Sequence, residues 1–118
     1  MKTIFVVDDS DTNLAMAEEA LEDHYNVMTV PSAAKMFTLL EKITPDLILL
    51  DIEMPEMNGF DALKKLKTGS SANIPVFFLT GTTSAEIEER SSKLGALGIV
   101  TKPFAADSLL DRIKPHIR

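Results

Sequence analysis

The sequence holds a small set of residues whose side chains could do chemistry and which all follow short apolar runs. Asp51 is the clearest example, because the apolar residues 47–50 lead directly into it and a carboxylate is costly to bury. The full set comprises three carboxylates, one hydroxyl and one ammonium: Asp8, Asp9, Asp51, Thr80 and Lys102. These groups would suit the binding of a cation and a phosphate, provided that the fold brings them together.

The apolar runs that precede these residues predict strands. The runs are short and lie at residues 4–7, 25–30, 47–50, 75–79 and 97–100. Apolar residues at helical spacing follow each run and predict five helices. The fourth helix, at about residues 84–93, is mostly polar, with Ile87 and Leu94 as its clearest apolar anchors. The last helix begins near Ala106 and is expected to reach Arg118, with Pro115 disturbing its end.

Five strands that alternate with five helices predict an α/β fold. The strands are continuous apolar runs rather than alternations of apolar and polar residues, which is typical of strands covered on both faces. We therefore expect a parallel sheet with helices on both sides. Right-handed connections would then place the carboxyl end of every strand at one edge of the sheet. No linker or internal repeat interrupts the pattern, so a single domain is expected over residues 1–118.

The composition narrows the classes of function. The chain has 118 residues, 45% of them hydrophobic, and a net charge of −6, which argues against a general affinity for nucleic acid or for an anionic membrane. It contains no cysteine, so disulfides and thiolate metal sites are excluded. No segment resembles a secretory apolar region or a membrane span. A cytoplasmic protein is expected.

Phosphoryl transfer on a carboxylate is the chemistry that the five residues fit best. Three carboxylates at one edge would repel one another, and a hard cation such as Mg²⁺ would relieve that repulsion through oxygen ligands alone. An aspartate can act as a nucleophile toward phosphorus. Lys102 and the Thr80 hydroxyl could then contact the oxygens of the phosphoryl group. Asp51 would lie at a rigid strand end beside the metal.

Four motifs resemble the receiver domain of two-component response regulators. They read VVDDS at residues 6–10, LILLDIEMPEMNG at 47–59, FLTG at 78–81 and VTKPF at 100–104. Their order and spacing match the family over essentially the whole chain. The resemblance implies a flavodoxin-like doubly wound fold with five parallel strands in the order 2-1-3-4-5.

The resemblance also implies a role for each acidic residue. Asp51 would accept a phosphoryl group from the phosphohistidine of a histidine kinase in a Mg²⁺-dependent reaction. Asp9 and Asp51 would bind Mg²⁺ through their carboxylates, Asp8 would help through water, and Glu53 would contribute its backbone carbonyl. The protein would be no enzyme beyond its own phosphorylation and dephosphorylation.

The remaining implications concern switching and partners. Lys102 would contact the phosphate, Thr80 would move toward it after transfer, and the peptide bond before Pro103 would be cis. The helix 84–93, the last strand and the last helix would form the face that reads out the signal. The implied partners are a histidine kinase or phosphotransfer protein and a downstream effector protein, with a homodimer through the same face as a further possibility.

Two positions depart from the family, and Glu53 and Thr82 match two of its variable positions near the phosphate. Ile99 stands where the family often has Tyr or Phe, so rotation of an aromatic ring cannot carry the signal here. Gly81 replaces the common alanine and should make the turn after Thr80 more flexible. Glu53 brings a second negative group near the phosphate, and we expect it to slow dephosphorylation by disturbing the attacking water.

Several alternatives remain open at this point. The chain could be an excised receiver of a multidomain regulator or an intermediate in a phosphorelay. A phosphatase with an aspartate nucleophile is disfavoured, because Glu53 stands where such enzymes have a second aspartate. A flavin or nucleotide carrier is disfavoured because Asp8 and Asp9 would repel a phosphate. A receiver that binds partners without phosphate is disfavoured by the complete acid set.

Overall fold

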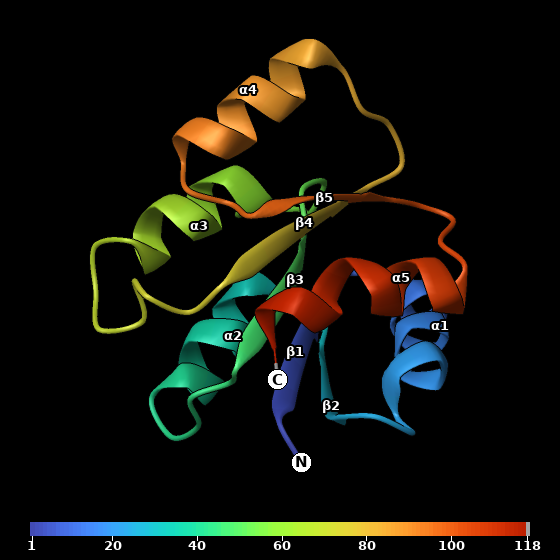
Figure 1. The fold of residues 1–118 in the computed structure, drawn as a ribbon. Helices are drawn as coiled ribbons and strands as arrows, with labels where there is room; N and C mark the ends of the chain where they lie inside the picture. The colour runs from blue at the N-terminus through green and yellow to red at the C-terminus, as the bar shows by residue number, and fades with distance from the viewer. Residues whose placement is uncertain (118) are drawn as a thin grey trace.

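The strands form one parallel sheet at the centre of the molecule. The computed structural model describes residues 1–117, and within them the sheet has the order β2-β1-β3-β4-β5 (Figure 1). The strands are β1 (Thr3–Val7), β2 (Asn26–Val30), β3 (Leu47–Asp51), β4 (Val76–Thr80) and β5 (Gly98–Thr101). This order confirms the predicted flavodoxin-like arrangement, with β1 and β3 adjacent at the point where the strand order reverses.

The register of the sheet brings the strand ends to the same level. The pairing of β1 with β3 ends at Val7 and Leu50, and the pairing of β4 with β5 ends at Thr80 and Thr101. All of these pairs are parallel. The chain therefore leaves the four strands at one edge of the sheet, where the residues singled out above are found.

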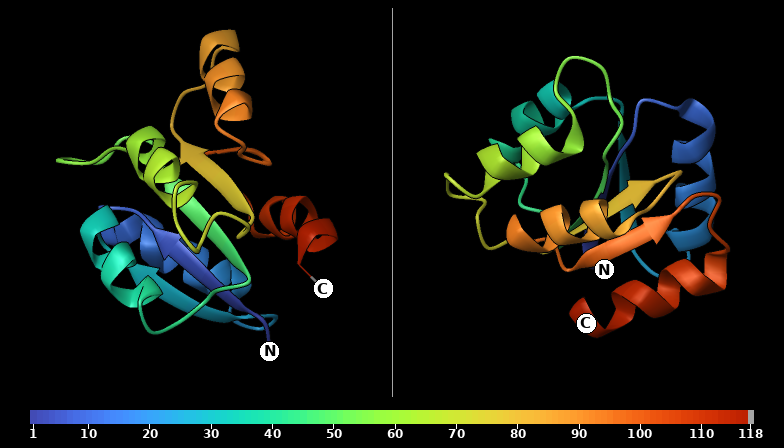
Figure 2. Two further views of the ribbon diagram at one scale, coloured as in Figure 1. Left: turned by 90° about the vertical axis from the view of Figure 1, so that its left-hand side faces the viewer. Right: turned by 90° about the horizontal axis from the view of Figure 1, so that it is seen from above.

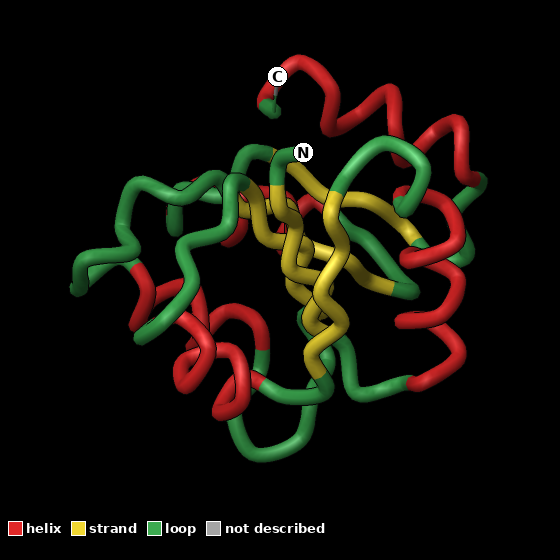
Figure 3. The backbone as a smooth tube through the Cα atoms, turned by 90° about the horizontal axis from the view of Figure 1, so that it is seen from below, coloured by secondary structure: helices red, strands yellow, loops and turns green. Residues whose placement is uncertain are grey.

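Helices cover both faces of the sheet (Figures 2 and 3). They are α1 (Asp11–Leu21), α2 (Ala33–Leu40), α3 (Gly59–Leu66), α4 (Ala85–Lys93) and α5 (Ala106–Ile113). Side chains of α2, α3 and α4 pack with one set of strand residues, whereas side chains of α1 and α5 pack with the opposite set. The sheet is thus the middle layer of three, as the continuous apolar strands predicted.

The two inner strands show why their sequences lack alternation. Every residue of β3 and of β4 is buried, because consecutive side chains point into the two opposite cores. In β1, Phe5 packs into the core under α2 and α3, while Ile4 packs into the core under α1 and α5. The edge strand β2 is more exposed, with Val30 as its buried residue.

The predicted boundaries agree with the structure to within a residue or two, except at the end of the chain. The last α-helix ends at Ile113 instead of continuing to Arg118, and a 3₁₀ turn follows at Lys114–His116. Pro115 lacks the backbone N–H that a further helical turn would need, which explains the early end. Arg118 lies outside the described residues. None of the described helices has the length and hydrophobicity required to cross a bilayer.

The helix α4 is attached to the molecule more weakly than its neighbours. Its anchors Ile87 and Leu94 are half-buried against the core, and its buried residue is the polar Ser91. Ser84 caps its N-terminus, since the Ser84 hydroxyl oxygen accepts a hydrogen bond from the N–H of Ile87 at 3.2 Å. The cap therefore supplies a large share of what orders the first turn.

Removal of this cap is expected to loosen α4 without unfolding the domain. A lost N-cap costs about 1 kcal/mol, so Ser84→Ala should speed amide hydrogen exchange in α4 about five-fold. Ser32→Ala, which removes the equivalent cap of α2, is the matched control and should leave α4 unchanged. Unaltered exchange in α4 of the Ser84 variant would show that packing alone orders this helix.

Candidate functional site

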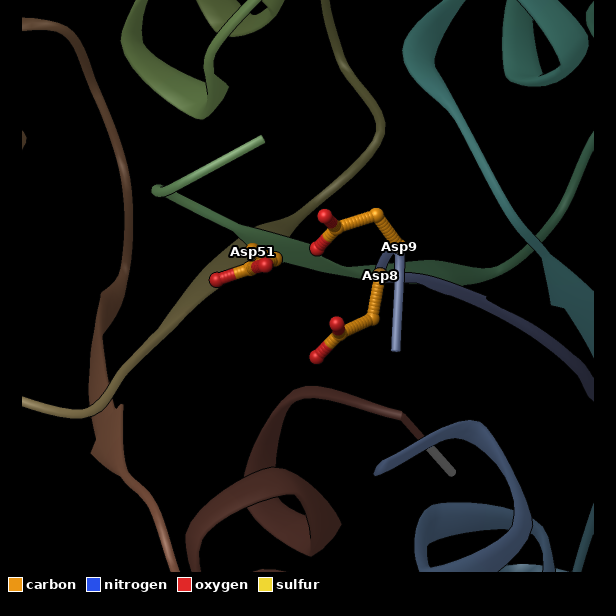
Figure 4. Close-up of side chains that lie close together, drawn as sticks. All are labelled: Asp8, Asp9 and Asp51. Carbon is orange, nitrogen blue, oxygen red and sulfur yellow. The ribbon is translucent and has the colours of Figure 1, made fainter. Parts of the chain in front are cut away.

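Three carboxylates converge at the carboxyl edge of the sheet. Asp8 and Asp9 directly follow β1 and Asp51 ends β3, and each offers an oxygen within 4.8 Å of the others (Figure 4). Asp8 and Asp51 are buried, whereas Asp9 is exposed. The N–H of Ser10 donates to Asp8 Oδ1 at 2.9 Å, which fixes the orientation of that carboxylate. The structure thus brings together residues that lie more than 40 positions apart in the sequence.

Lys102 joins the acidic cluster from the end of β5. Its Nζ lies 3.1 Å from Asp51 Oδ1 and 3.3 Å from Asp8 Oδ2, and only 16% of its side chain is exposed. Its backbone N–H donates to the carbonyl of Thr80 at 2.7 Å, so the lysine is tied to the end of β4. The Lys102–Pro103 peptide bond is cis, as the resemblance implied.

The environment favours a proton on both partners of this ion pair. Burial raises the pKa of Asp51 from 3.8 to about 7; the hydrogen bond from Lys102 opposes this, and the negative charges of Asp8 and Glu53 reinforce it. Burial lowers the pKa of Lys102, but its hydrogen bonds to Asp51 and Asp8 and their charges outweigh burial and raise it above 10.5. Lys102 therefore stays cationic and compensates part of the negative charge.

Thr80 is fully buried at the end of β4, but its hydroxyl does not point into the lysine–aspartate pair. Thr80 Oγ1 lies 2.7 Å and 3.2 Å from the two carboxylate oxygens of Glu53. It also lies 2.7 Å from the carbonyl of Thr82. Sequence reasoning gave Glu53 a backbone carbonyl for the metal and a negative side chain near the phosphate, and it missed this contact with Thr80. The negative charge of Glu53, two positions after Asp51, was the available signal that this side chain lies near the site. The hydrogen-bond partner of the side chain, however, depends on the conformation of the loop.

The loop between β3 and α3 is held by a close backbone approach. Gly59 begins α3, and its N–H donates to the carbonyl of Ile52 at 2.9 Å. A Cβ atom at Gly59 would lie 2.4 Å from the carbonyl oxygen of Asp51. The Asn58 side chain caps the helix by accepting from the N–H of Asp61 at 2.9 Å. The position of Asp51 relative to α3 therefore depends on a glycine.

Comparison with known families decides which family this arrangement belongs to. The sequence model described as "Response regulator receiver domain" matches residues 4–114, which is nearly the whole chain. The chain belongs to this family. Receiver domains are the phosphoryl-accepting parts of response regulators, and they form no family of catalytic enzymes. They generally bind Mg²⁺ and interact with histidine kinases or phosphotransfer proteins and with downstream effectors.

Individual relatives of this receiver domain differ in length. The chain is 36% identical to a probable cyclic di-GMP phosphodiesterase of Vibrio cholerae over 98% of its own length but only 26% of that protein. It is 30% identical to the cell cycle transcriptional regulator CtrA of Caulobacter vibrioides, of which it covers 51%. It is also 30% identical to the sporulation initiation phosphotransferase F of Bacillus subtilis, of which it covers 92%. The chain thus spans about a quarter of one of these relatives and about half of another.

Solved structures show the same fold. The chemotaxis protein CheY4 of Vibrio cholerae is 30% identical to this chain, and its structure superimposes with a TM-score of 0.94. The match covers 99% of each chain. A response regulator from Thermotoga maritima, 28% identical, gives a TM-score of 0.90. The α/β architecture of this receiver domain is therefore the one found in both of these structures.

The residues of this receiver domain suit a hard divalent cation. Among the described residues, the carboxylates of Asp8, Asp9 and Asp51 meet a single ammonium, so the cluster holds more carboxylates than cations. Their oxygens are the ligands that Mg²⁺ prefers. The N–H of Glu53 donates to Asp51 Oδ1 at 3.3 Å, which places the Glu53 backbone beside the cluster. The donor set therefore fits the metal that receiver domains bind.

Proposed function

We propose that Asp51 is the phosphoryl acceptor of this receiver domain. The observation that carries the proposal is the ion pair between Lys102 and Asp51 inside a cluster of three carboxylates. Asp51 lies at the end of a fully buried strand, so its carboxylate is held in position at the rim of the sheet. Asp8, Asp9, Asp51 and the backbone carbonyl of Glu53 are the proposed ligands of Mg²⁺.

The proposed transfer forms one bond and breaks another. A carboxylate oxygen of Asp51 attacks the phosphorus of a phosphohistidine, and the phosphorus–nitrogen bond breaks with its electron pair going to the imidazole. Bound Mg²⁺ would supply positive charge to a phosphoryl oxygen. Lys102 would turn from the Asp51 oxygen to the phosphoryl oxygens, because its ammonium already lies 3.1 Å from a carboxylate oxygen of Asp51. The Thr80 hydroxyl would donate to another phosphoryl oxygen.

The partners follow from this chemistry. The donor would be a histidine kinase or a phosphotransfer protein of the cytoplasm, and the domain would extend over residues 1–118. The face formed by α4, β5 and α5 would contact the effector or a second copy of the chain. The weak attachment of α4 supports this assignment, because a loosely held helix can shift at low cost when Asp51 is modified.

The test is the mass of the protein after incubation with Mg²⁺ and a small phosphodonor such as acetyl phosphate. The protein should gain one phosphoryl group, and a chelator should prevent the gain. An acyl phosphate is cleaved by hydroxylamine, and borohydride reduces it to homoserine, which should appear at position 51. A phosphoryl group that resists hydroxylamine, or homoserine at a different position, would refute the assignment of Asp51.

A further inference from the structure

The hydroxyl of Thr80 has more acceptors than it has protons. One carboxylate oxygen of Glu53 and the carbonyl of Thr82 both lie 2.7 Å from Thr80 Oγ1, and both can only accept. The N–H of Thr82 approaches the same hydroxyl oxygen at 3.3 Å and donates to it. The single hydroxyl proton must therefore be shared, and a carboxylate is the stronger acceptor of the two. The hydroxyl is fully engaged before any phosphoryl group arrives.

The proposed role of Thr80 requires that this engagement be broken. To donate to a phosphoryl oxygen on Asp51, Thr80 must withdraw its proton from Glu53 and Thr82. Thr80 is buried and ends a strand that is buried throughout, so its backbone cannot move freely toward Asp51. Glu53, in contrast, is exposed and lies on the loop after β3. The movable partner of the hydrogen bond is the glutamate.

We propose that the Glu53 side chain is a positioning residue that holds the Thr80 hydroxyl away from the acceptor site until Asp51 is phosphorylated. This inference rests on the proposed function of Asp51. The hydrogen bond of Thr80 to Glu53 competes with its hydrogen bond to the phosphoryl group. Removal of the glutamate therefore favours the state in which Thr80 contacts the phosphoryl group.

The charge of the phosphoryl group supplies the means of release. Glu53 is close enough to Asp51 that its negative charge raises the pKa of Asp51. Phosphorylation replaces the single negative charge of the Asp51 carboxylate by up to two on the phosphoryl oxygens, so the site gains about one further negative charge. Repulsion would push the flexible, exposed Glu53 side chain outward, and the Thr80 proton would pass to the phosphoryl oxygen. The same event that creates the new acceptor thus weakens the old one.

This arrangement offers a route for switching that needs no aromatic ring. Ile99 is half-buried in the core beside α4, and its side chain has no polar group that could report on the site. Thr80 is followed by the loop that leads to Ser84 and α4. A change in the partners of Thr80 and Thr82 therefore occurs at the base of the weakly attached helix.

The test uses beryllofluoride, which resembles a phosphoryl group on a carboxylate, with saturating Mg²⁺. Glu53→Ala removes the charge and the acceptor, whereas Glu53→Gln removes the charge and keeps an amide oxygen as acceptor. Glu53→Ala should bind the analogue about five-fold more tightly than Glu53→Gln, as expected for one lost hydrogen bond. In the Thr80→Val background, the two substitutions at Glu53 should give equal affinities.

Two controls make the result specific. Glu56→Gln removes the same charge from the same loop and should change affinity less than about two-fold, as exposed charges do. In the free protein, the amide resonance of Thr82 should shift in Glu53→Ala and return toward the parental position in Glu53→Gln. Equal affinities of the two Glu53 variants in the protein that keeps Thr80, or an unshifted Thr82 amide, would overturn the inference. Failure of the parent to bind the analogue would instead refute the proposed function.

Discussion

Replacement of Asp51 by asparagine is expected to abolish phosphoryl incorporation and, at the same time, to stabilise the metal-free protein. The loss follows because an amide oxygen is no nucleophile toward phosphorus. The gain in stability follows because the carboxylate is buried beside Asp8. Lys102 keeps a partner in the variant, since its Nζ also lies 3.3 Å from Asp8. A substitution that improves stability while it removes activity marks a residue retained for function.

The gain in stability from Asp51→Asn should grow as the pH rises. The folded-state pKa of Asp51 is about 7 and its ordinary value is 3.8, so the folded protein holds a proton that the unfolded chain has already lost. Below about pH 4 both states are protonated and the carboxylate costs nothing. Between about pH 4 and 7 the free energy of unfolding of the parent falls as the pH rises, by at most about 1.4 kcal/mol per pH unit. Above pH 7 the full cost is present.

The measurement is thermal unfolding in the presence of a chelator from pH 4.5 to 8, values chosen to span the interval between the two pKa values. Asp51→Asn should melt close to the parent at the low end and about 4 °C or more above it at the high end, as expected for a gain of about 1 kcal/mol. Asp61→Asn, an exposed acid of the same region, should follow the parent. A variant no more stable than the parent at pH 8 would mean that Asp51 is not destabilised by its surroundings.

Magnesium should narrow the difference in thermal stability between the parent protein and Asp51→Asn. A cation that binds only the folded state stabilises it by mass action, and the parent has one carboxylate more to offer than the variant. The parent should therefore gain more from saturating Mg²⁺ than Asp51→Asn gains. Equal gains would place the cation away from Asp51 and would contradict the proposed ligand set.

The sheet and the meeting of the acids could be predicted from the sequence because they depend on long-range rules. Continuous apolar runs such as residues 47–50 indicate strands buried on both faces, and the handedness of the connections fixes where their ends lie. Asp8 follows β1 and Asp51 ends β3, and these strands pair in register, so the proximity of the two acids required no knowledge of side-chain rotamers. The place of Lys102 at the same edge of the sheet could be predicted by the same reasoning, because it follows the apolar run that forms β5.

The contact of Glu53 with Thr80 could not be predicted, because it depends on the local path of a loop. Glu56 in that loop has a positive φ of 67°, and Gly59 packs against the backbone of Asp51. Neither feature follows from apolar periodicity. The end of the last helix was predicted wrongly for a related reason, since the helical spacing of Ile113 and Ile117 continues past Pro115 although the backbone does not. Both errors concern local backbone conformation and leave the topology intact.

Replacement of Gly59 by alanine is expected to destabilise the protein by about 1–3 kcal/mol, the range for extra atoms forced into a packed interior. Helix propensity alone would predict the opposite sign, because alanine is better than glycine by about 1 kcal/mol within a helix. The clash decides the sign: a Cβ would lie 2.4 Å from the carbonyl oxygen of Asp51 and 2.8 Å from the Cα of Ile52. These are backbone atoms that no rotamer change can move aside.

The clash should also reach the functional site. Relief requires α3 to move away from the end of β3, which would displace the loop that carries Glu53 and weaken both Mg²⁺ binding and phosphoryl transfer to Asp51. Gly69→Ala is the matched control, because no atom lies within 4 Å of the added Cβ in its exposed loop. Urea denaturation should give a lower midpoint for the Gly59 variant and an unchanged or slightly higher one for the Gly69 variant. If the two variants denatured alike, α3 would not be held against the acceptor strand by this backbone contact.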